Sequence, residues 1–247
     1  MRRVLSVREL ALGYGREPLL EELSFDVSRG EVFAILGGSG CGKSTLLRAL
    51  IGLLHPMRGT IRLFGDRSPQ QALEPPMFGV LFQSSALFGS MTLLENVSLP
   101  LQKWTDLDDD AVEAVAVSRL RVVGLAGFER HLPSEVSGGM KKRAGIARAL
   151  ALDPKLLFLD EPSAGLDPIT AAGLDELILT LRQSLGVTTV LVTHELQSIY
   201  RVADACIMLD RDAKGIIARG SPRDLRDRST DARVAAFFMR RAQRASQ

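Results

Sequence analysis

The sequence predicts an α/β fold in which a glycine-rich loop joins a buried strand to a helix. Residues 31–36 form a short, nearly continuous apolar run, as expected for a strand buried on both faces. The run ends in glycines and continues into Lys43–Leu50, which has the pattern of a helix. Two further segments, at 155–159 and 187–192, have the pattern of buried parallel strands and are separated by a helical stretch around 171–184. Strands that alternate with helices in this way favour a parallel sheet.

Local patterns predict the other elements of the first two thirds of the chain. Residues 4–12 and 23–27 have the composition of strands, and residues 60–64 alternate like a strand after a turn at 56–59. The stretch from about 84 to 152 looks helical, which predicts a mostly α insertion between two strand-rich parts.

One helix of this insertion is marked by charge as well as by periodicity. Asp108, Asp109 and Asp110 place negative charge at its start, where the helix dipole favours it. Apolar residues then follow at helical spacing, namely Val112, Val115, Ala116, Leu120 and Val123.

The end of the chain predicts two closing strands, at 205–209 and 215–218, and then a basic tail. Thr230 and Asp231 are suited to cap a last helix. Its apolar face would carry Val234, Phe237 and Phe238, with Arg240, Arg241 and Arg244 beyond them. Three uses of this helix stay open: packing on its own domain, contact with a partner subunit or a second copy, and membrane binding.

Composition and charge limit the classes of protein to which the chain can belong. The chain has 247 residues, 46% hydrophobic and 24% charged, with a net charge of +2, an ordinary soluble composition. No apolar run approaches the roughly 18–20 residues of a membrane span, and the start lacks the core of a signal peptide. We therefore expect any work at a membrane to be that of a peripheral subunit. The two cysteines, Cys41 and Cys206, are expected to be free, as in a cytosolic chain.

The glycine-rich loop matches the phosphate-binding pattern G-x-x-x-x-G-K-[ST] in full. Glycines let the backbone wrap around phosphate oxygens, and the following helix adds the positive end of its dipole. Lys43 is expected to reach the β- and γ-phosphates, and the Ser44 hydroxyl to bind Mg²⁺. The residues of the loop are Gly37, Gly38, Ser39, Gly40, Cys41, Gly42, Lys43, Ser44 and Thr45.

Two other segments supply groups for phosphate chemistry. The apolar run Leu156 to Leu159 ends in Asp160 and Glu161. Asp160 can hold Mg²⁺, and Glu161 is the candidate general base that polarises the attacking water. Ser137, Gly138 and Gly139 offer a hydroxyl and amides at a helix N-terminus, which is a second anion site.

Together these motifs resemble the ATP-binding subunit of an ABC transporter, and the resemblance runs over nearly the whole chain. It implies a P-loop NTPase fold, with a RecA-like core that includes an N-terminal antiparallel β part, and a helical ABC subdomain. We expect one ATP-binding domain over 1–247: a core at about 1–84 and 153–220, the helical subdomain at about 85–152, and the basic tail at about 221–247.

The resemblance also implies ATP and Mg²⁺ as ligands and roles for further residues. Tyr14 would stack on adenine, Gln83 would reach Mg²⁺ and the attacking water, and His194 would contact the γ-phosphate. Asp167 resembles the loop that touches the other subunit, although it is equally suited to cap a helix before Pro168. Two copies would pair head to tail, so that each ATP lies between one phosphate loop and the partner copy's Ser137, Gly138 and Gly139.

Within this family, the chain is similar to the ATPases of Mla-type (MCE-associated) phospholipid transporters. The similar stretches are Ser-Gly-Gly-Met-Lys-Lys-Arg at 137–143, the run at 81–88, and 94–97 with 99–101 after it. Met140 stands where the family usually has Gln, which removes an amide from that position.

This similarity implies an ATPase dimer on the cytoplasmic face of the inner membrane, beneath an integral membrane permease. An MCE-domain lipid-binding protein and a small STAS-domain protein are the further partners that it implies. Phe88, Met91 and Leu94 would form the groove that receives the permease, unless they only pack the helical subdomain.

Two other functions stay open. One is the ATPase of an importer for amino acids or another small solute, which Met140 and the run at 83–88 argue against. The other is a soluble ABC ATPase acting on nucleic acid or ribosomes. Such proteins usually carry long coiled coils or two cassettes, whereas this chain has one cassette, near-neutral charge and no long basic stripe. We expect no nucleic-acid partner.

Overall fold

The computed structural model describes residues 3–244, with the side chains of residues 240–244 left out of the description. The prediction for Arg240, Arg241 and Arg244 therefore lies outside the described side chains. The chain forms two compact units: Met1–Gln71 together with Thr188–Gln247, and Ala72–Val187. The helical subdomain expected at 85–152 falls inside the second unit.

The first unit begins with an antiparallel sheet in the order β2-β1-β4. Its strands are β1 (Arg3–Leu12), β2 (Leu20–Ser28) and β4 (Arg58–Leu63). In β2, alternate side chains such as Phe25 and Val27 are buried, because successive residues of a strand point to opposite faces. Val7 pairs with Phe25 on one side and Ile61 on the other. This sheet is the antiparallel β part that the sequence led us to expect.

A second set of strands in the first unit runs in the order β7-β3-β8-β9. These are β3 (Val32–Gly37), β7 (Thr188–Val192), β8 (Ala205–Asp210) and β9 (Gly215–Gly220). Strand β3 is parallel to both β7 and β8, and β9 closes antiparallel to β8. All residues of β3 and β7 are buried, which explains the apolar sequence of β3 and the β-branched and apolar residues of β7, Thr188 and Thr189 included. Helices α1 (Lys43–Leu50) and α6 (Leu196–Val202) complete this part.

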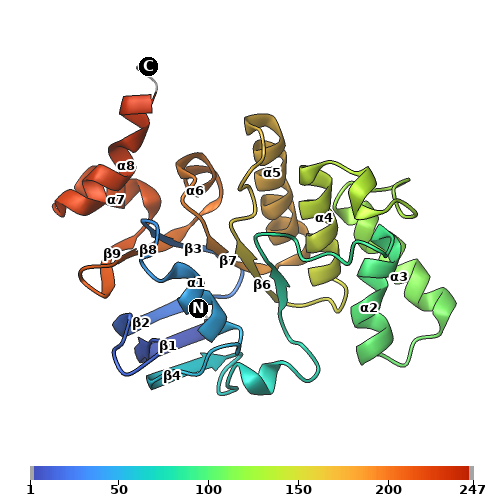
Figure 1. Ribbon diagram of the computed structural model, residues 1–247, viewed down its shortest axis with the longest axis horizontal. Coiled ribbons are helices and arrows are strands. Elements are labelled where there is room, and N and C mark those ends of the chain that lie inside the picture. Colours follow the sequence, from blue (N-terminus) through green and yellow to red (C-terminus); the bar gives the residue numbers. More distant parts are fainter. Residues whose placement is uncertain (1–2, 245–247) are drawn as a thin grey trace. The chain divides into compact units, whose positions relative to one another are not determined.

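The last helix packs on its own unit, which is the first of the three uses considered for it. Helices α7 (Pro222–Arg228) and α8 (Ala232–Arg244) lie beside each other, with α7 against β9 (Figure 1). Val234, Phe237 and Phe238 are buried in one apolar cluster. The other buried members of the cluster are Ala34, Leu36, Ile199, Cys206, Met208 and Leu225.

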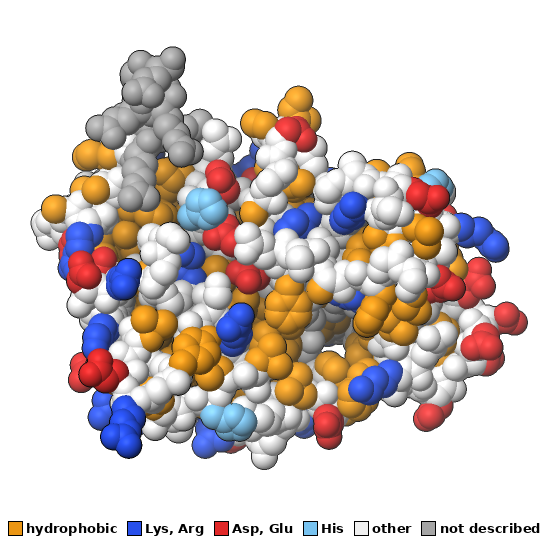
Figure 2. Space-filling view, in the orientation of Figure 1, with side chains coloured by type: hydrophobic (Ala, Val, Ile, Leu, Met, Phe, Trp, Pro, Cys, Tyr) orange, Lys and Arg blue, Asp and Glu red, His pale blue; other side chains and the backbone are white. Residues whose placement is uncertain are grey.

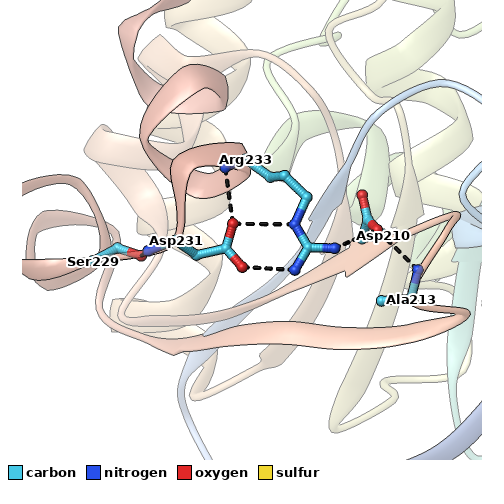
Figure 3. Close-up of polar contacts among 5 residues, drawn as sticks. All are labelled: Asp210, Ala213, Ser229, Asp231 and Arg233. Atoms are coloured by element: carbon cyan, nitrogen blue, oxygen red, sulfur yellow. Dashed lines mark hydrogen bonds and ion pairs between the residues drawn. The ribbon is translucent and has the colours of Figure 1, made fainter.

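A charged contact fixes the start of α8. The Arg233 guanidinium lies between Asp231 and Asp210, and its nitrogens are 2.7 Å from Asp231 Oδ2 and 2.8 Å from Asp210 Oδ1 (Figure 3). The hydrogen bonds from Arg233 lower the pKa of Asp231 to about 2. Because Asp210 ends β8, this contact ties the first turn of α8 to the central strands of the unit.

The second unit contains the parallel pair β5 (Gly79–Leu81) and β6 (Leu156–Asp160). Its helices are α2 (Leu93–Trp104), α3 (Asp109–Val122), α4 (Gly138–Ala149) and α5 (Pro168–Leu185), with a short 3₁₀ turn η2 (Pro133–Glu135). Another 3₁₀ turn, η1 (Gln70–Ala72), lies where the chain leaves the first unit and enters the second. Helices α2, α3 and α4 pack together (Figure 1).

Capping residues set the helix starts of this unit. Thr92 and Glu95 form a capping box at α2. Asp108 caps α3 by accepting from the Ala111 amide at 2.8 Å, and Asp109 and Asp110 follow in its first turn. Acidic side chains gather on the surface at the α3 end of the unit (Figure 2).

The expectation of a continuous helical stretch from residue 84 is wrong for residues 84–92. Ser85 and Ala86 have left-handed backbones, with φ of 63° and 46°. The buried Asn96 side chain donates to the carbonyls of Phe88, Met91 and Thr92 at 2.9–3.1 Å. Because a side chain satisfies these carbonyls, the segment does not need a helix to pair its backbone.

No helix in the described part of the chain is long and apolar enough to cross a membrane.

We expect that Phe238→Ala lowers the free energy of unfolding by about 3–5 kcal/mol, because it opens a cavity in the cluster under α8. Met239→Ala is the matched control, since Met239 is 67% exposed on the same helix. Urea unfolding of both variants gives the comparison. Equal midpoints for the two variants would show that α8 does not contribute to the core of its unit.

Candidate active site

The loop between β3 and α1 has glycines at positions where a side chain would clash with its neighbours. A Cβ at Gly37, where φ is 148°, would lie 2.5 Å from the Leu209 carbonyl oxygen on β8. Gly42 precedes α1 with φ of 100°, and a Cβ there would lie 2.8 Å from Leu20 Cδ1. Among the described residues, no side chain caps the N-terminus of α1. The first amides of α1 are therefore available to an anion.

The phosphate loop presents a polar surface to solvent. Ser39, Gly40 and Ser44 are exposed, and Thr45 and Cys41 are buried beneath them. This division fits a cradle whose outer rim meets the ligand and whose inner residues pack on the unit.

Lys43 is held within the loop that it serves. Its ammonium donates to the carbonyls of Gly37 and Gly38, at 3.0 and 2.9 Å. These bonds place a positive charge over the same backbone whose amides attract anions. Electrostatics and backbone shape therefore both favour phosphate at this loop.

Cys41 is not suited to act as a nucleophile. Burial raises the pKa of its thiol, although the Lys43 charge opposes that rise. A protonated thiol is a poor nucleophile. The backbone amides of the loop, and not the Cys41 thiol, are therefore the groups suited to bind an anion.

Tyr14 lies beside α1. Its hydroxyl accepts a hydrogen bond from Arg48 Nη1 at 3.1 Å and lies 3.5 Å from Thr45 Oγ1. The residue is 65% exposed. The hydroxyl end is thus fixed near the phosphate loop while the ring is open to solvent, as a stacking surface requires.

His194 emerges at the same sheet edge as the phosphate loop. Ile35 pairs with Val192 in the parallel ladder of β3 and β7. Gly37 and His194 each follow two residues later, so both leave the sheet at its carboxyl edge. The His194 Nε2 atom is 3.7 Å from Glu195 Oε1, and more than half of the imidazole is exposed.

The second unit brings Gln83 and Glu161 together in a comparable way. Leu81 pairs with Leu159 in the parallel ladder of β5 and β6, and Gln83 and Glu161 each follow two residues later. Gln83 is exposed, and Glu161 is 9% exposed. Glu161 also has a left-handed backbone, with φ of 45°.

One residue that joins these two segments was missed by the sequence reasoning. The Lys142 ammonium donates to the carbonyl of Gln83 at 2.6 Å and to that of Glu161 at 3.2 Å. A signal was present, because Lys142 lies three residues after Gly139 and four before Ile146, on the buried side of α4. A lysine at such a position needs partners.

The predicted second anion site is a helix start with two exposed residues. The Ser137 hydroxyl caps α4 by accepting from the Met140 amide at 3.3 Å. Ser137 and Gly138 are exposed, whereas Gly139 is buried. Asp167 caps α5 by accepting from the amides of Ile169 and Thr170, both at 3.0 Å, so its role as a helix cap is confirmed.

The residues expected to bind a metal ion have suitable chemistry. Ser44 offers a hydroxyl, Gln83 an amide oxygen and Asp160 a carboxylate, and all three are the hard oxygen ligands that Mg²⁺ prefers. Ser44 belongs to the first unit, and Gln83 and Asp160 belong to the second.

Comparison with known proteins gives matches over most of the chain. A family model described as ABC transporter matches residues 20–164. A protein of Mycobacterium leprae named as a probable ribonucleotide transport ATP-binding protein, mkl, is 40% identical over 95% of this chain and 68% of its own length. The chain thus spans about two thirds of that relative. The intermembrane phospholipid transport system ATP-binding protein MlaF of Escherichia coli is 38% identical over 95% of this chain and 88% of its own.

Solved structures agree with these matches. The cbiO1 subunit of the ABC transporter complex cbiONQ from Clostridium perfringens has a TM-score of 0.84 and 28% identity, and the match covers 100% of this chain and 99% of that one. A dimeric ATP-binding cassette in a post-hydrolysis state, bound to ADP and Pi, has a TM-score of 0.77 and 27% identity over 88% of this chain and 98% of that one.

We expect that Tyr14→Ala weakens ATP binding about tenfold, because base–aromatic stacking is worth about 1–3 kcal/mol. Tyr14→Phe is the control, since it keeps the ring and removes only the hydroxyl. Its affinity should stay close to that of the parent chain. Fluorescence titration with an ATP analogue measures both. A loss of affinity in Tyr14→Phe equal to that in Tyr14→Ala would assign the effect to the hydroxyl contacts and reject stacking.

Proposed function

This chain belongs to the ABC transporter family, and we propose that it is the ATP-hydrolysing subunit of a membrane transporter that moves phospholipid between the inner and outer membranes. The observation that carries the family role is the phosphate loop on β3 and α1, within a chain that matches ABC proteins along its length. The proposal of phospholipid as the cargo rests on narrower evidence. This evidence is the similarity to the MlaF protein and the sequence of this chain around Met140.

Binding of ATP follows from the first unit. The triphosphate lies on the amides at the start of α1, with the Lys43 ammonium against its β- and γ-phosphates. Tyr14 stacks on the adenine ring. His194, at the same sheet edge as the phosphate loop, contacts the γ-phosphate.

Hydrolysis follows from residues of the second unit. Glu161 is the general base that takes a proton from the attacking water, and Gln83 orients that water. The low exposure of Glu161 favours this role, because electrostatic interactions strengthen where water is excluded. Ser44, Gln83 and Asp160 would hold Mg²⁺, which neutralises charge on the β- and γ-oxygens during phosphoryl transfer.

Two copies complete each site. One structural relative is a dimer bound to ADP and Pi. In this chain, Ser137 and Gly138 lie at the exposed start of α4, where the Ser137 hydroxyl caps the helix. We infer that they close on the γ-phosphate of an ATP held by the partner copy, in a head-to-tail pair with two equivalent sites. ATP then holds the pair together, and hydrolysis releases it.

A groove in the second unit is suited to receive the permease. It has a volume of about 330 Å³ and an open, largely apolar lining. Phe88 lies in the lining and is 56% exposed, as expected for the receiving surface, whereas Met91 and Leu94 are not among its lining residues. Other lining residues are Phe78, Leu99, Pro100, Trp104 and Lys103. A short helix from a membrane subunit fits such a groove.

We propose that the subunit works at the cytoplasmic face of the inner membrane, as a peripheral component. An MCE-domain protein on the far side and a STAS-domain protein on the near side are the further partners that we propose. Both follow from the likeness to Mla-type systems.

A ribonucleotide is the second candidate cargo, because the relative with 40% identity carries that name. The two cargoes differ in what the intact complex would retain after purification. A phospholipid is amphipathic and stays with a lipid-binding partner, whereas a ribonucleotide is a soluble anion.

We expect that Glu161→Gln lowers kcat roughly 100-fold or more while leaving ATP affinity nearly unchanged, because the carboxylate is lost and the amide keeps its shape. The variant should also accumulate as a dimer when ATP is present. ATPase assays and light scattering test these two results together. Turnover close to that of the parent chain would show that Glu161 is not the base.

We expect that the tagged chain, purified from membranes, brings a permease and an MCE-domain protein with it, and that organic extracts of the complex contain phospholipid. Phe88→Glu should abolish this co-purification by placing a charge in the apolar groove. Leu107→Glu is the control, because Leu107 is 44% exposed and outside the groove. A complex with a solute-binding protein in place of the MCE-domain protein, or one that retains ribonucleotide alone, would contradict the lipid assignment.

A further inference from the structure

Helix α4 holds other segments of its unit through cationic side chains that donate to backbone carbonyls. Lys142 binds Gln83 and Glu161. Arg148 binds Ser85 and Ala86 at 2.9 and 2.7 Å. Charge-assisted bonds of this kind are stronger than neutral ones, so they tie the loop after β5 to α4.

The carbonyls that α4 holds belong in part to strained backbone. Glu161, Ser85 and Ala86 all have left-handed φ angles, of 45°, 63° and 46°. For residues other than glycine, such a conformation is strained and persists only where its surroundings enforce it. At Glu161 the Lys142 ammonium and the Ala164 amide both donate to the strained residue's carbonyl. The direction in which the Glu161 side chain leaves the backbone therefore depends on these donors.

Packing alone does not explain a lysine at position 142. It is 6% exposed, and a buried ammonium is costly unless it is paired. Burial lowers the pKa of Lys142, and the negative charges of Asp160 and Glu161 oppose that shift. An apolar side chain would pack there without this cost, so the ammonium contributes something that packing does not.

The position of Lys142 on α4 connects the start of that helix with the segments of Gln83 and Glu161. It lies five residues after Ser137, which is about 7–8 Å along a helix. The helix start at Ser137 is the part that we assign to the partner's ATP, and Lys142 is in direct contact with the segments of Gln83 and Glu161. A shift of α4 on closure therefore reaches both segments through one side chain.

We propose that Lys142 is a positioning residue for hydrolysis, which orients Glu161 and the Gln83 segment through their carbonyls and so links engagement of the α4 start to activation of the attacking water. This inference rests on the roles proposed above for Glu161 and Ser137. Lys142 does not contact the reacting atoms, and it acts through the two residues that do.

The test is Lys142→Met in the full-length chain, which keeps the length of the side chain and removes the ammonium. We expect kcat to fall roughly 10- to 100-fold, because misplacement of a catalytic group by about 1 Å has effects of that size. KM for ATP should stay within error of the parent value. Lys141→Met, the same change at the neighbouring position of α4, should leave kcat unchanged.

A second measurement separates positioning from folding. Lys142→Met added to Glu161→Gln should reduce the residual turnover little further, because the base through which Lys142 acts is already gone. Lys142→Arg should restore part of kcat, since a guanidinium also donates to two carbonyls.

Each result decides between the two accounts. A kcat for Lys142→Met equal to the parent value, or a reduction fully additive with Glu161→Gln, would overturn the positioning role. So would a reduced kcat that Lys142→Arg does not improve and that follows a lower melting temperature in every Lys142 variant. If instead the parent chain itself does not hydrolyse ATP, or Glu161→Gln retains turnover, the failure belongs to the proposed function.

Discussion

Parallel pairing of strands decides where the polar groups of the site emerge. In the ladder of β3 and β7, Gly37 and His194 both stand two residues beyond paired positions, and the same holds for Gln83 and Glu161 in the ladder of β5 and β6. Parallel strands present their carboxyl ends at one edge, so groups far apart in sequence meet there. The buried apolar strands therefore determine the placement of the chemistry as well as the stability of the core.

Helix α4 also holds the segments that follow the ends of β5 and β6. Its start at Ser137 is exposed, while its buried side carries Lys142 against the carbonyls of Gln83 and Glu161. A helix that is open at one end and fixed to catalytic segments further along can respond to a ligand at the open end. The start of α4 belongs to the second unit and the phosphate loop to the first, and we propose that a second copy of the chain supplies the ligand at that start.

Sequence patterns predicted the strands and most helices because these depend on short-range periodicity and capping. The phosphate loop, the acidic end of β6 and the acidic start of α3 all follow from neighbouring residues. The segment 84–92 could not be predicted in that way, since Arg148 holds Ser85 and Ala86 from 62–63 residues further along the chain. The buried position of Lys142 could be read from helical spacing, but its partners could not, because they lie 59 residues before it and 19 after it. The docking of α8 on its own unit also required the tertiary contacts of Phe237 and Phe238.

The central claim is that each ATP is enclosed by two copies of the chain, and interchain cross-linking tests it most directly. Ser39→Cys and Ser137→Cys together place one reactive thiol on the phosphate loop and one at the start of α4, both at exposed positions, while the native Cys41 and Cys206 are buried. With a short bismaleimide in the Glu161→Gln chain, we predict a covalent dimer that forms only with ATP and only when both cysteines are present. A chain that stays monomeric with ATP bound, or that cross-links equally without nucleotide, would contradict the account.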